Sequence, residues 1–593
     1  MAKIKVSDYI AKRLKEHGVE HFFMVSGGGA MHLNDSLGRV FPYTACHHEQ
    51  ACAIAAEGYA KVNGKMAVVN VTTGPGGLNC LNGVFGEWTD STPVLYISGQ
   101  VKYSTCMDSC KNIPLRQLGD QEADIISIVS PITKYSKMVT NPNEIKYHLD
   151  KAIYEATNGR KGPVWLDIPM NIQGAIIEEE DLIEFKTPKK TGFEFNFDVI
   201  IEQIKNAKKP LIIAGQGIKL AHQEDNFKKL IEALKIPVVL TFNGMDILES
   251  DNRLYVGRIG TIGQRAGNFA LQSADLILCL GTRNNIRQIS YNYENFAKNA
   301  FKIVVDIDKA ELEKPTLKPD IEICADLADF IPELLGKIKN HNILQQEKWL
   351  KHTQELKEKF SFENWTEHTK NSGKIEPYHF TNTLTKLLKE NDILVMANGS
   401  ACVCTFQNAI IKKGQRFILN SGSASMGYAL PASIGAYYEA KNRNIICLEG
   451  DGSIMMNLQE LQTLVHNKLP IKIFVINNNG YSSIRQTQKR FFDGNMTGSG
   501  ATSGVSVPDF IKIASAFGIN TKRISDPKTL EENICEALNT DSAILCEVMI
   551  EEEYDFAPKL SAKKLDDGTM ISPSLEDMYP FLDREEFEKW ARF

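Results

Sequence analysis

Short apolar runs alternate with amphipathic stretches along most of the chain. In the first third, residues 22–25, 66–71, 94–97 and 164–168 are apolar runs of strand length, and residues 49–62 carry apolar positions at helical spacing. Strands that alternate with helices are typical of parallel α/β domains, in which each helix returns the chain to the start of the next strand. The pattern therefore predicts a parallel sheet covered by helices.

The same alternation occurs in three blocks, and polar stretches at residues 178–196 and 340–374 separate them. We predict an α/β protein with three doubly wound, parallel-sheet domains and a C-terminal tail. The predicted units are the first domain (1–178), the central domain (197–340), the third domain (375–550) and the tail (551–593). The strands predicted in the later domains are residues 211–214, 237–240, 276–280, 302–305, 393–396, 445–448, 471–476 and 544–548.

Composition narrows the range of partners. The 593 residues carry a net charge of -6, which offers no basic surface for nucleic acid. No apolar run approaches the roughly 18 residues that a membrane span needs, and the N-terminus lacks the apolar core of a signal peptide. Twelve cysteines are scattered without zinc-site spacing, as expected of reduced thiols. We expect a cytoplasmic protein without nucleic-acid or membrane partners.

Two glycine-rich segments follow successive predicted strands in the third domain, at the sheet edge where such folds bind ligands. The residues concerned are Gly450, Asp451, Gly452, Ser453, Asn478, Gly480 and Tyr481. Asp451 and Asn478 offer hard oxygen ligands, and the carbonyl of Gly480 is a third candidate, a set that suits Mg²⁺. The glycines let the backbone approach phosphate oxygens at a helix start. A bare Gly-Asp-Gly is usually a turn, but the whole arrangement resembles the metal–diphosphate signature of thiamine diphosphate enzymes.

A second motif lies in the first domain, at residues 46–60 and 71–79. Its His-Glu-Gln, Gly-Tyr-Ala and Thr-Gly-Pro-Gly elements resemble the pyrimidine-binding domain of acetohydroxyacid synthase and its relatives. On the residues alone, Glu49 would be an acid at a helix start. The resemblance implies that Glu49 is the activating carboxyl, hydrogen-bonded to the aminopyrimidine of thiamine diphosphate. It also implies cofactor contacts from Thr73, Pro75 and Asn79. His48 is either a substrate contact or a structural residue.

Smaller matches to the same family complete the predicted pocket. Residues 420–431 resemble a segment whose methionine, here Met426, bends the cofactor so that its two rings approach each other. Residues 398–401 match a loop that contacts the diphosphate, and residues 26–30 match a turn whose glycine approaches substrate, although Gly27 replaces the usual proline. The additional candidates are Gly29, Gln121, Gly399, Ser400, Ala401 and Ser425. For Gln121, a solvated loop position is the alternative.

The central domain resembles the FAD-binding domain of the synthases in the order of its glycine-rich turns. The family's Arg-Phe-Asp-Asp-Arg is replaced here by residues 283–287, Arg-Asn-Asn-Ile-Arg. Relatives hold FAD, ADP or nothing in this domain, and all three alternatives stay open.

The resemblance implies decarboxylation of a 2-oxo acid, and pyruvate is the expected donor. The positions at which this sequence differs from the synthases concern the acceptor substrate. The synthase's discriminating tryptophan corresponds to Thr487, and a pocket phenylalanine corresponds to Asp120. Polar groups there favour a polar carbonyl acceptor such as a nucleotide-linked keto-sugar. Arg485, Lys489 and Arg490 are either contacts for its phosphates or a solvated face.

We therefore expect a thiamine diphosphate-dependent carboligase. Acetolactate synthase and a simple 2-oxo acid decarboxylase are the alternatives, and a non-catalytic scaffold is the alternative from another class. Active sites of this family lie between two chains, so the resemblance implies a homodimer or homotetramer.

Overall fold

The computed structural model of the chain describes residues 3–110, 112–189, 192–339, 341, 346–365, 373–564 and 570–591. Parts of both predicted connectors and of the tail, and residue 340 of the predicted central domain, lie outside these ranges.

The first domain is built on a six-stranded parallel sheet in the order β3-β2-β4-β5-β7-β6. Its strands are β2 (Phe22–Met24), β3 (Tyr43–Ala45), β4 (Ala67–Val71), β5 (Val94–Gln100), β6 (Tyr135–Met138) and β7 (Val164–Pro169). Its main helices are α1 (Val6–Glu16), α2 (Met31–Val40), α3 (Glu49–Asn63), α5 (Leu81–Asp90), α6 (Ile125–Val129) and α7 (Ile145–Thr157).

Apolar cores lie on both faces of this sheet. Leu95 and Ile97 of β5 pack in the core that contains α1, whereas Val94 and Tyr96 pack in the core that contains α3. Successive strand residues point to opposite faces, so a strand covered on both sides is apolar throughout. This explains why the sequence shows continuous apolar runs, and it confirms the doubly wound architecture.

The third domain repeats this topology in the order β16-β15-β17-β18-β20-β19. Its strands are β15 (Ile393–Met396), β16 (Arg416–Ile418), β17 (Ile445–Gly450), β18 (Lys472–Asn477), β19 (Asn520–Ile524) and β20 (Ile544–Met549). Its main helices are α17 (Pro377–Leu387), α18 (Ser400–Asn408), α19 (Ala429–Ala440), α20 (Asp451–Ile454), α21 (Glu460–His466), α22 (Ser482–Phe491), α23 (Phe510–Ala516) and α24 (Leu530–Leu538).

The central domain has a different order, β11-β10-β9-β12-β13-β14, in which the strand sequence runs outward from the middle in both directions. This is the order of dinucleotide-binding folds. Its strands are β9 (Pro210–Ala214), β10 (Val238–Leu240), β11 (Tyr255–Arg258), β12 (Leu276–Leu280), β13 (Phe301–Asp306) and β14 (Ile321–Cys324). Its main helices are α9 (Phe197–Asn206), α11 (Glu224–Leu234), α12 (Arg265–Ser273) and α15 (Leu327–Ile338).

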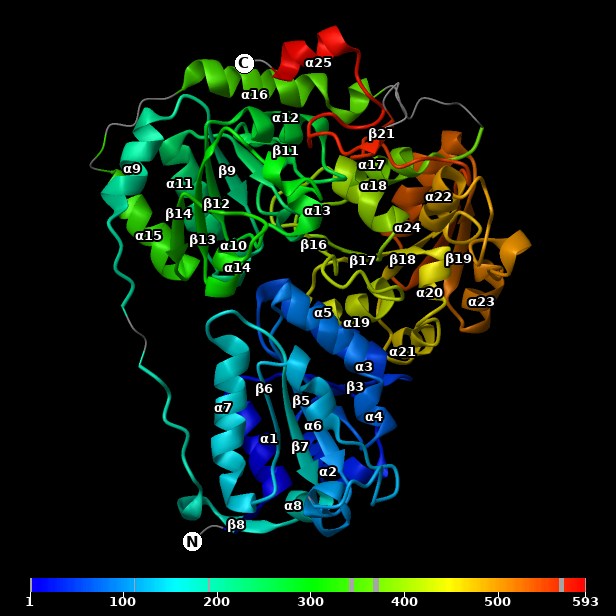
Figure 1. Cartoon of the computed structure of the whole chain (residues 1–593). Helices are drawn as coiled ribbons and strands as arrows, with labels where there is room; N and C mark the ends of the chain where they lie inside the picture. The colour runs from blue at the N-terminus through cyan, green and yellow to red at the C-terminus, as the bar shows by residue number, and fades with distance from the viewer. Residues whose placement is uncertain are drawn as a thin grey trace.

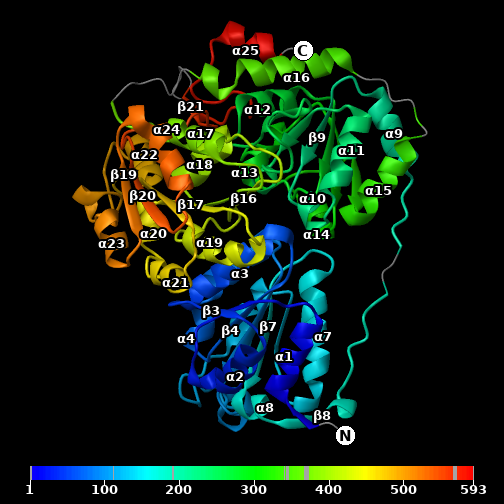
Figure 2. The ribbon, with the colours of Figure 1, turned by 180° about the vertical axis from the view of Figure 1, so that it is seen from behind.

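Figure 1 shows the first domain below, in blue and cyan, with the central domain (green) and the third domain (yellow to orange) side by side above it. Figure 2 shows the same arrangement from behind. The tail crosses from the third domain to the central one, where Asn268 and Arg265 donate hydrogen bonds to the carbonyls of Leu575 and Met578, both 3.1 Å. Its last helix, α25 (Arg584–Ala591), lies near α16 (Glu347–Lys359).

Helices α3 and α19 join the first and third domains. A Cβ added to Gly58 would lie 2.1 Å from the carbonyl oxygen of Ala432, and one added to Gly435 would lie 1.7 Å from that of Ala55. Only glycine permits backbones to approach this closely. The two helices therefore fix the first and third domains against each other through reciprocal glycine contacts.

Among the described residues, no helix combines the length and apolar character needed to cross a lipid bilayer.

Candidate functional site

In all three domains candidate residues follow strands at, or next to, the point where strand order reverses. In the first sheet this point lies between β2 and β4, in the third between β15 and β17, and in the central one between β9 and β12. Loops on either side of a reversal point diverge and leave a crevice, which is where open α/β sheets bind ligands.

Asp451 occupies the centre of the third-domain crevice. It is 1% exposed; its Oδ1 accepts a hydrogen bond from the N–H of Gly452 (2.7 Å), and its Oδ2 accepts from those of Asn478 (3.0 Å) and Gly480 (2.9 Å). Burial raises the pKa of Asp451 to about 6, although these N–H groups oppose the rise. The carboxylate thus holds the loop of residues 478–480, the metal loop, in place.

Asn478 supplies the test of whether a metal fits here. Its Oδ1 is buried and has no hydrogen-bond partner within the described residues. A buried polar atom without a partner is costly, so an oxygen left open beside a carboxylate suits a cation. No group of three or more His, Cys, Asp or Glu side chains that could hold a metal occurs in the part of the chain that the structure describes. The predicted ligands Asp451, Asn478 and Gly480 fit a hard cation such as Mg²⁺.

The residues around the metal loop explain one of the two glycines of the Gly-Asp-Gly motif, Gly452. The ring of Tyr481 lies over Gly452, where an added Cβ would be 2.3 Å from a ring carbon, whereas a Cβ on Gly450 would make only an ordinary contact, 3.9 Å, with Cβ of Ser453. The Ser453 hydroxyl accepts a hydrogen bond from the N–H of Gly427 (2.8 Å). The first motif is therefore tied to the segment that carries Met426.

The diphosphate-contacting loop begins α18. Gly399 has φ of 73° and precedes the helix, and Ser400 is hydrogen-bonded to the hydroxyl of Tyr554. Ala401 is fully buried. Asn398 donates to the carbonyl of Ser425 (2.6 Å), so this loop also contacts the Met426 segment.

The Met426 segment reaches the first domain. The hydroxyl of Ser425 donates to Oδ1 of Asn82 (2.7 Å), and Met426 itself is half-buried. Ala424 has φ of 57°, in the left-handed region that favours glycine. Ala424 thus adopts a backbone conformation in which glycine is usual.

Glu49 is the first residue of α3 and is half-buried. Its Oε2 accepts a hydrogen bond from Nδ2 of Asn79 (2.9 Å). Nδ1 of His48 accepts from the N–H of Gln50 (3.1 Å) and so caps the helix, which gives His48 a structural role. Pro75 and Asn79 are exposed beside the glutamate. Glu49 therefore faces outward from the first domain with an amide partner that orients its carboxyl.

The Thr-Gly-Pro-Gly loop is held in place by hydrogen bonds to residues of the first sheet. Thr73 is buried and donates to Oε1 of Gln100, whose Nε2 in turn donates to Asp167 (3.0 Å). Gly74 has φ of 60°, and a Cβ there would lie 2.0 Å from the carbonyl oxygen of Gln121. Gln121 is exposed with φ of 62°. The structure thus brings Gln121 directly against this loop.

Gly29 is buried, whereas the preceding residue, Gly28, is exposed. The N–H of Gly29 donates to Oγ1 of Thr72 (3.1 Å), and its carbonyl accepts from Gln173 (2.7 Å). Gly28 is exposed, and nothing lies within 4 Å of its Cβ position. Gly29 is therefore a packing residue within the domain, and its substrate contact stays a prediction.

Two residues of this region escaped the sequence analysis as site residues. Gln100 ends β5, and Tyr554 follows β20; each is a hydrogen-bonding residue just beyond or at the end of a buried strand, which is the signal that could have identified them.

The basic residues of α22 already have partners. Arg485 donates to backbone carbonyls around the metal loop, Lys489 pairs with Glu553, and Arg490 donates to the carbonyl of Ala562 (3.2 Å). The expectation that they contact acceptor phosphates gains no support from this arrangement. The solvated-face alternative fits Lys489 and Arg490, which are exposed.

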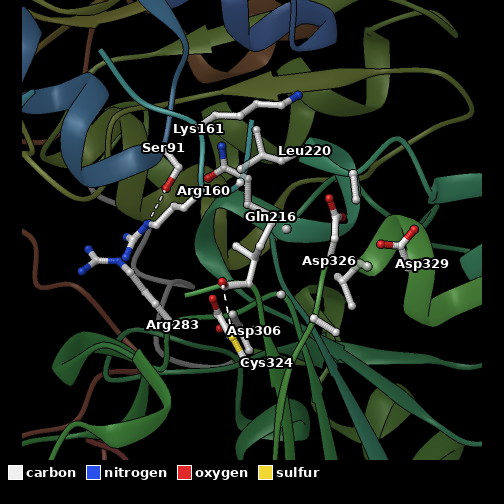
Figure 3. Close-up of a pocket in the computed structure, with 18 of the residues that line it drawn as sticks. Ser91, Arg160, Lys161, Gln216, Leu220, Arg283, Asp306, Cys324, Asp326 and Asp329 are labelled. Atoms are coloured by element: carbon white, nitrogen blue, oxygen red, sulfur yellow. Dashed lines mark hydrogen bonds between the residues drawn. The ribbon is translucent and has the colours of Figure 1, made fainter. Parts of the chain in front are cut away.

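The central domain contains a cavity of about 940 Å³ at its reversal point. Figure 3 shows Gln216 and Arg283 lining it from the loops after β9 and β12, and Asp306 from the end of β13. Arg160 and Ser91 enter from the first domain and are hydrogen-bonded to each other (3.0 Å). The cavity therefore combines acidic and basic groups from two domains.

Comparisons with protein families divide the chain as its sheets do. Residues 4–127 match the N-terminal TPP binding domain of thiamine pyrophosphate enzymes, residues 197–334 match their central domain, and residues 397–548 match their C-terminal TPP binding domain.

Several curated proteins are similar over nearly the whole chain. The acetolactate synthase large subunit of Lactococcus lactis is 32% identical over 95% of this chain and 96% of its own length. The isozyme 2 large subunit of Escherichia coli is 31% identical over 92% of this chain and 95% of its own length. The probable acetolactate synthase large subunit of Methanocaldococcus jannaschii is 30% identical, with 92% of each chain covered.

Proposed function

The chain belongs to the thiamine pyrophosphate enzyme family, and on that basis we propose that it is a carboligase that removes CO₂ from a 2-oxo acid and transfers the remaining acyl unit to a carbonyl acceptor. Pyruvate is the proposed donor. When bound, thiamine diphosphate would supply a carbon acid whose deprotonated form is a nucleophile toward keto groups, and a ring that can hold the electron pair left when CO₂ departs.

One observation carries this proposal: the buried Oδ1 of Asn478 has no hydrogen-bond partner among the described residues, and it lies on the loop whose N–H groups bind the buried carboxylate of Asp451. In the proposal these two side chains and the carbonyl of Gly480 hold Mg²⁺ at the diphosphate end. Met426 supports the cofactor between its two ends. Glu49, oriented by Asn79, exchanges a proton with the pyrimidine ring.

The proposed acceptor is larger and more polar than a simple 2-oxo acid, for example a nucleotide-linked keto-sugar. Thr487 and Asp120 replace large apolar residues of the synthases, and both are exposed. Acetolactate synthase is the second candidate, because the three relatives described above, which carry that name, are 30% to 32% identical over 92% to 95% of the chain.

We also propose a homodimer or homotetramer whose sites are completed by a second copy. Leu78 next to Asn79, Phe85 and Trp88 on α5, and Met455 and Met456 after the metal-binding motif are between 37% and 48% exposed. Apolar side chains gathered around a candidate site are typical of an interface. The free thiols of all twelve cysteines support the proposed cytoplasmic location.

The central cavity is proposed to hold a nucleotide, either FAD or ADP. Its strand order and its position at the reversal point support a dinucleotide, whereas the replaced residues 283–287 weigh against the flavin end. The visible absorption band of flavin in purified protein would establish FAD. A colourless protein that releases ADP on denaturation would favour ADP, and one that releases neither would favour an empty cavity.

A product screen tests the proposed reaction. The protein, with thiamine diphosphate and Mg²⁺, is incubated with pyruvate alone and with a panel of nucleotide-linked keto-sugars and 2-oxo acids, and products are identified by mass spectrometry. The proposal expects pyruvate consumption that depends on a keto-sugar, which gains an acetyl unit. Acetolactate from pyruvate alone would establish the synthase, and acetaldehyde would establish a decarboxylase. No consumption under any condition would favour a non-catalytic scaffold.

A further inference from the structure

We infer that Arg485 and Tyr554 are positioning residues that hold Asn478 in its metal-binding arrangement, Arg485 through the backbone and Tyr554 through the side chain. The inference rests on the proposed metal–diphosphate site and adds two residues to it. Neither residue belongs to the motifs that identify the site: Arg485 lies on α22, and Tyr554 lies beyond the matched C-terminal domain, which ends at residue 548.

Arg485 connects two segments of chain around the metal loop. Its Nη2 donates to the carbonyl of Asn478 (2.7 Å), and its Nη1 donates to the carbonyls of Asn479 (3.1 Å) and Ser499 (3.1 Å). A guanidinium presents its donors in a fixed planar fork, so a single side chain can hold three carbonyls in one geometry. A lysine ammonium at this position has no equivalent fork.

The metal loop is held from opposite sides by opposite charges. The N–H groups of Asn478 and Gly480 point to the carboxylate of Asp451, whereas the carbonyls of Asn478 and Asn479 point to Arg485. The loop adopts unusual conformations, with φ of 61° at Asn479 and 123° at Gly480. Such conformations persist only where the surroundings fix them. Asp451 fixes the amide side of the loop, and Arg485 fixes the carbonyl side.

Tyr554 sets the direction of the Asn478 side chain. Nδ2 of Asn478 donates to the Tyr554 hydroxyl over 3.4 Å, a long hydrogen bond, and that hydroxyl is also bonded to Ser400 of the diphosphate loop. With its nitrogen directed to the tyrosine, the amide leaves Oδ1 open. A ligand's outer partners orient it and raise the affinity of a metal site. Tyr554 therefore links the metal ligand to the diphosphate loop.

The test measures cofactor binding in the full-length protein. Thiamine diphosphate is titrated calorimetrically at low and high Mg²⁺ into the wild type and into Arg485→Gln, Arg485→Lys and Tyr554→Phe. We expect Arg485→Gln to weaken Mg²⁺-dependent binding by about 10–100-fold, the range for outer partners of metal ligands, and Tyr554→Phe to weaken it by a smaller factor. Arg485→Lys should not restore binding, because charge without the fork cannot hold three carbonyls.

Arg490→Gln is the matched control, since Arg490 lies on the same helix and is bonded to Ala562, away from the metal loop. At saturating cofactor and Mg²⁺, the Arg485 variants should keep a kcat within a few-fold of the wild type, so that the loss appears in affinity and in its Mg²⁺ dependence. A purely structural role would lower the melting temperature without changing that dependence.

The inference is overturned if Arg485→Gln and Arg485→Lys bind the cofactor as Arg490→Gln does. If instead the wild type and Arg490→Gln fail to bind thiamine diphosphate at all, the proposed cofactor site itself is wrong. Should Arg485→Gln not fold, Arg485→Lys, which keeps the charge, gives the same comparison.

Discussion

The first and third domains have the same strand order, yet their crevices carry opposite chemistry. In the first domain the residues after β4 are Thr73 and Gly74, and the half-buried Glu49 begins α3 with its carboxyl bonded to Asn79. In the third they are Asp451 and Asn478, with two positive-φ residues in the metal loop. The first crevice suits a heterocycle beside a carboxyl, and the third suits a phosphate-bound cation.

The difference teaches that topology fixes where a ligand lies and that a few loop residues decide which part of it is bound. Two copies of one architecture can therefore serve the two ends of a single cofactor. The central domain, with a third set of loops and another strand order, is suited to a separate nucleotide.

The proposed catalytic role of the first domain depends on the carboxyl of Glu49, and Glu49→Gln should abolish that role. We expect pyruvate decarboxylation to fall by about 10²–10⁴-fold, the usual contribution of a positioned acid–base group, while thiamine diphosphate binding stays within a few-fold of the wild type. Stopped assays of CO₂ release and calorimetry measure the two effects. Glu390→Gln, an exposed acid of the third domain, should change neither. Unchanged turnover in Glu49→Gln would remove this glutamate from the reaction.

In the third domain, Asp451→Ala should impair cofactor binding, whereas Glu49→Gln should impair turnover. Because both the metal and the metal loop lose their partner, thiamine diphosphate binding should weaken by about 100-fold or more, beyond the effect of an outer partner. Titration at several Mg²⁺ concentrations measures the loss, with the exposed Asp541→Ala as control. Normal binding in Asp451→Ala would show that this carboxylate holds no metal.

The reciprocal glycines of α3 and α19 test how closely the first and third domains pack against each other. Gly58→Ala and Gly435→Ala should each lower the unfolding free energy by about 1–3 kcal/mol, since both place a Cβ against backbone. Gly336→Ala, on α15 with nothing within 4 Å of its Cβ position, should be neutral or stabilising. Differential scanning calorimetry measures all three. If both interface variants behave like Gly336→Ala, the helices are less closely packed than described.

A buried carboxyl under the first crevice gives an effect that appears as a change of stability with pH. Burial raises the pKa of Asp167 to about 7, so the folded state keeps a proton that the unfolded state releases near pH 4. Stability from this group is complete below its unfolded pKa and is lost as pH rises to about 7, at about 1.4 kcal/mol per unit. The melting temperature of Asp167→Asn, relative to that of the wild type, should therefore rise between pH 5 and 7. Above pH 7 the difference between the two should stay constant. A difference that stays constant between pH 5 and 7 would contradict the assignment.

Much of the fold was predictable because buried parallel strands are apolar on both faces. All five residues of β4 are buried, and the sequence shows them as an uninterrupted run. Edge strands escaped prediction: β3 buries one residue of three and β19 one of five, so neither differs from a loop in its pattern. The central strands could therefore be predicted from the sequence, and they establish the architecture. The edge strands could be identified only in the structure.

The motif residues were predictable because their spacing follows the strands that carry them. Arg485 was not, because it acts through backbone contacts that exist only once α22 has packed beside the metal loop. Tyr554 carried only the general signal of a polar residue that follows a buried strand, and its contact with Asn478 needs the packed tail. Arg485 was predicted at the surface or at an acceptor's phosphates, and the structure instead directs it to the metal loop. Domain boundaries, site roles and the acceptor stay predictions.

The central claim is that Glu49 and Asp451 act on one cofactor, each contributed by a different chain. Mixing the inactive Glu49→Gln and Asp451→Ala proteins, with subunit exchange allowed, measures this directly. Random pairing in a two-fold dimer makes about half of the dimers mixed, each with one intact site, so about a quarter of wild-type pyruvate turnover should return. Turnover no higher than that of either variant alone would contradict the claim.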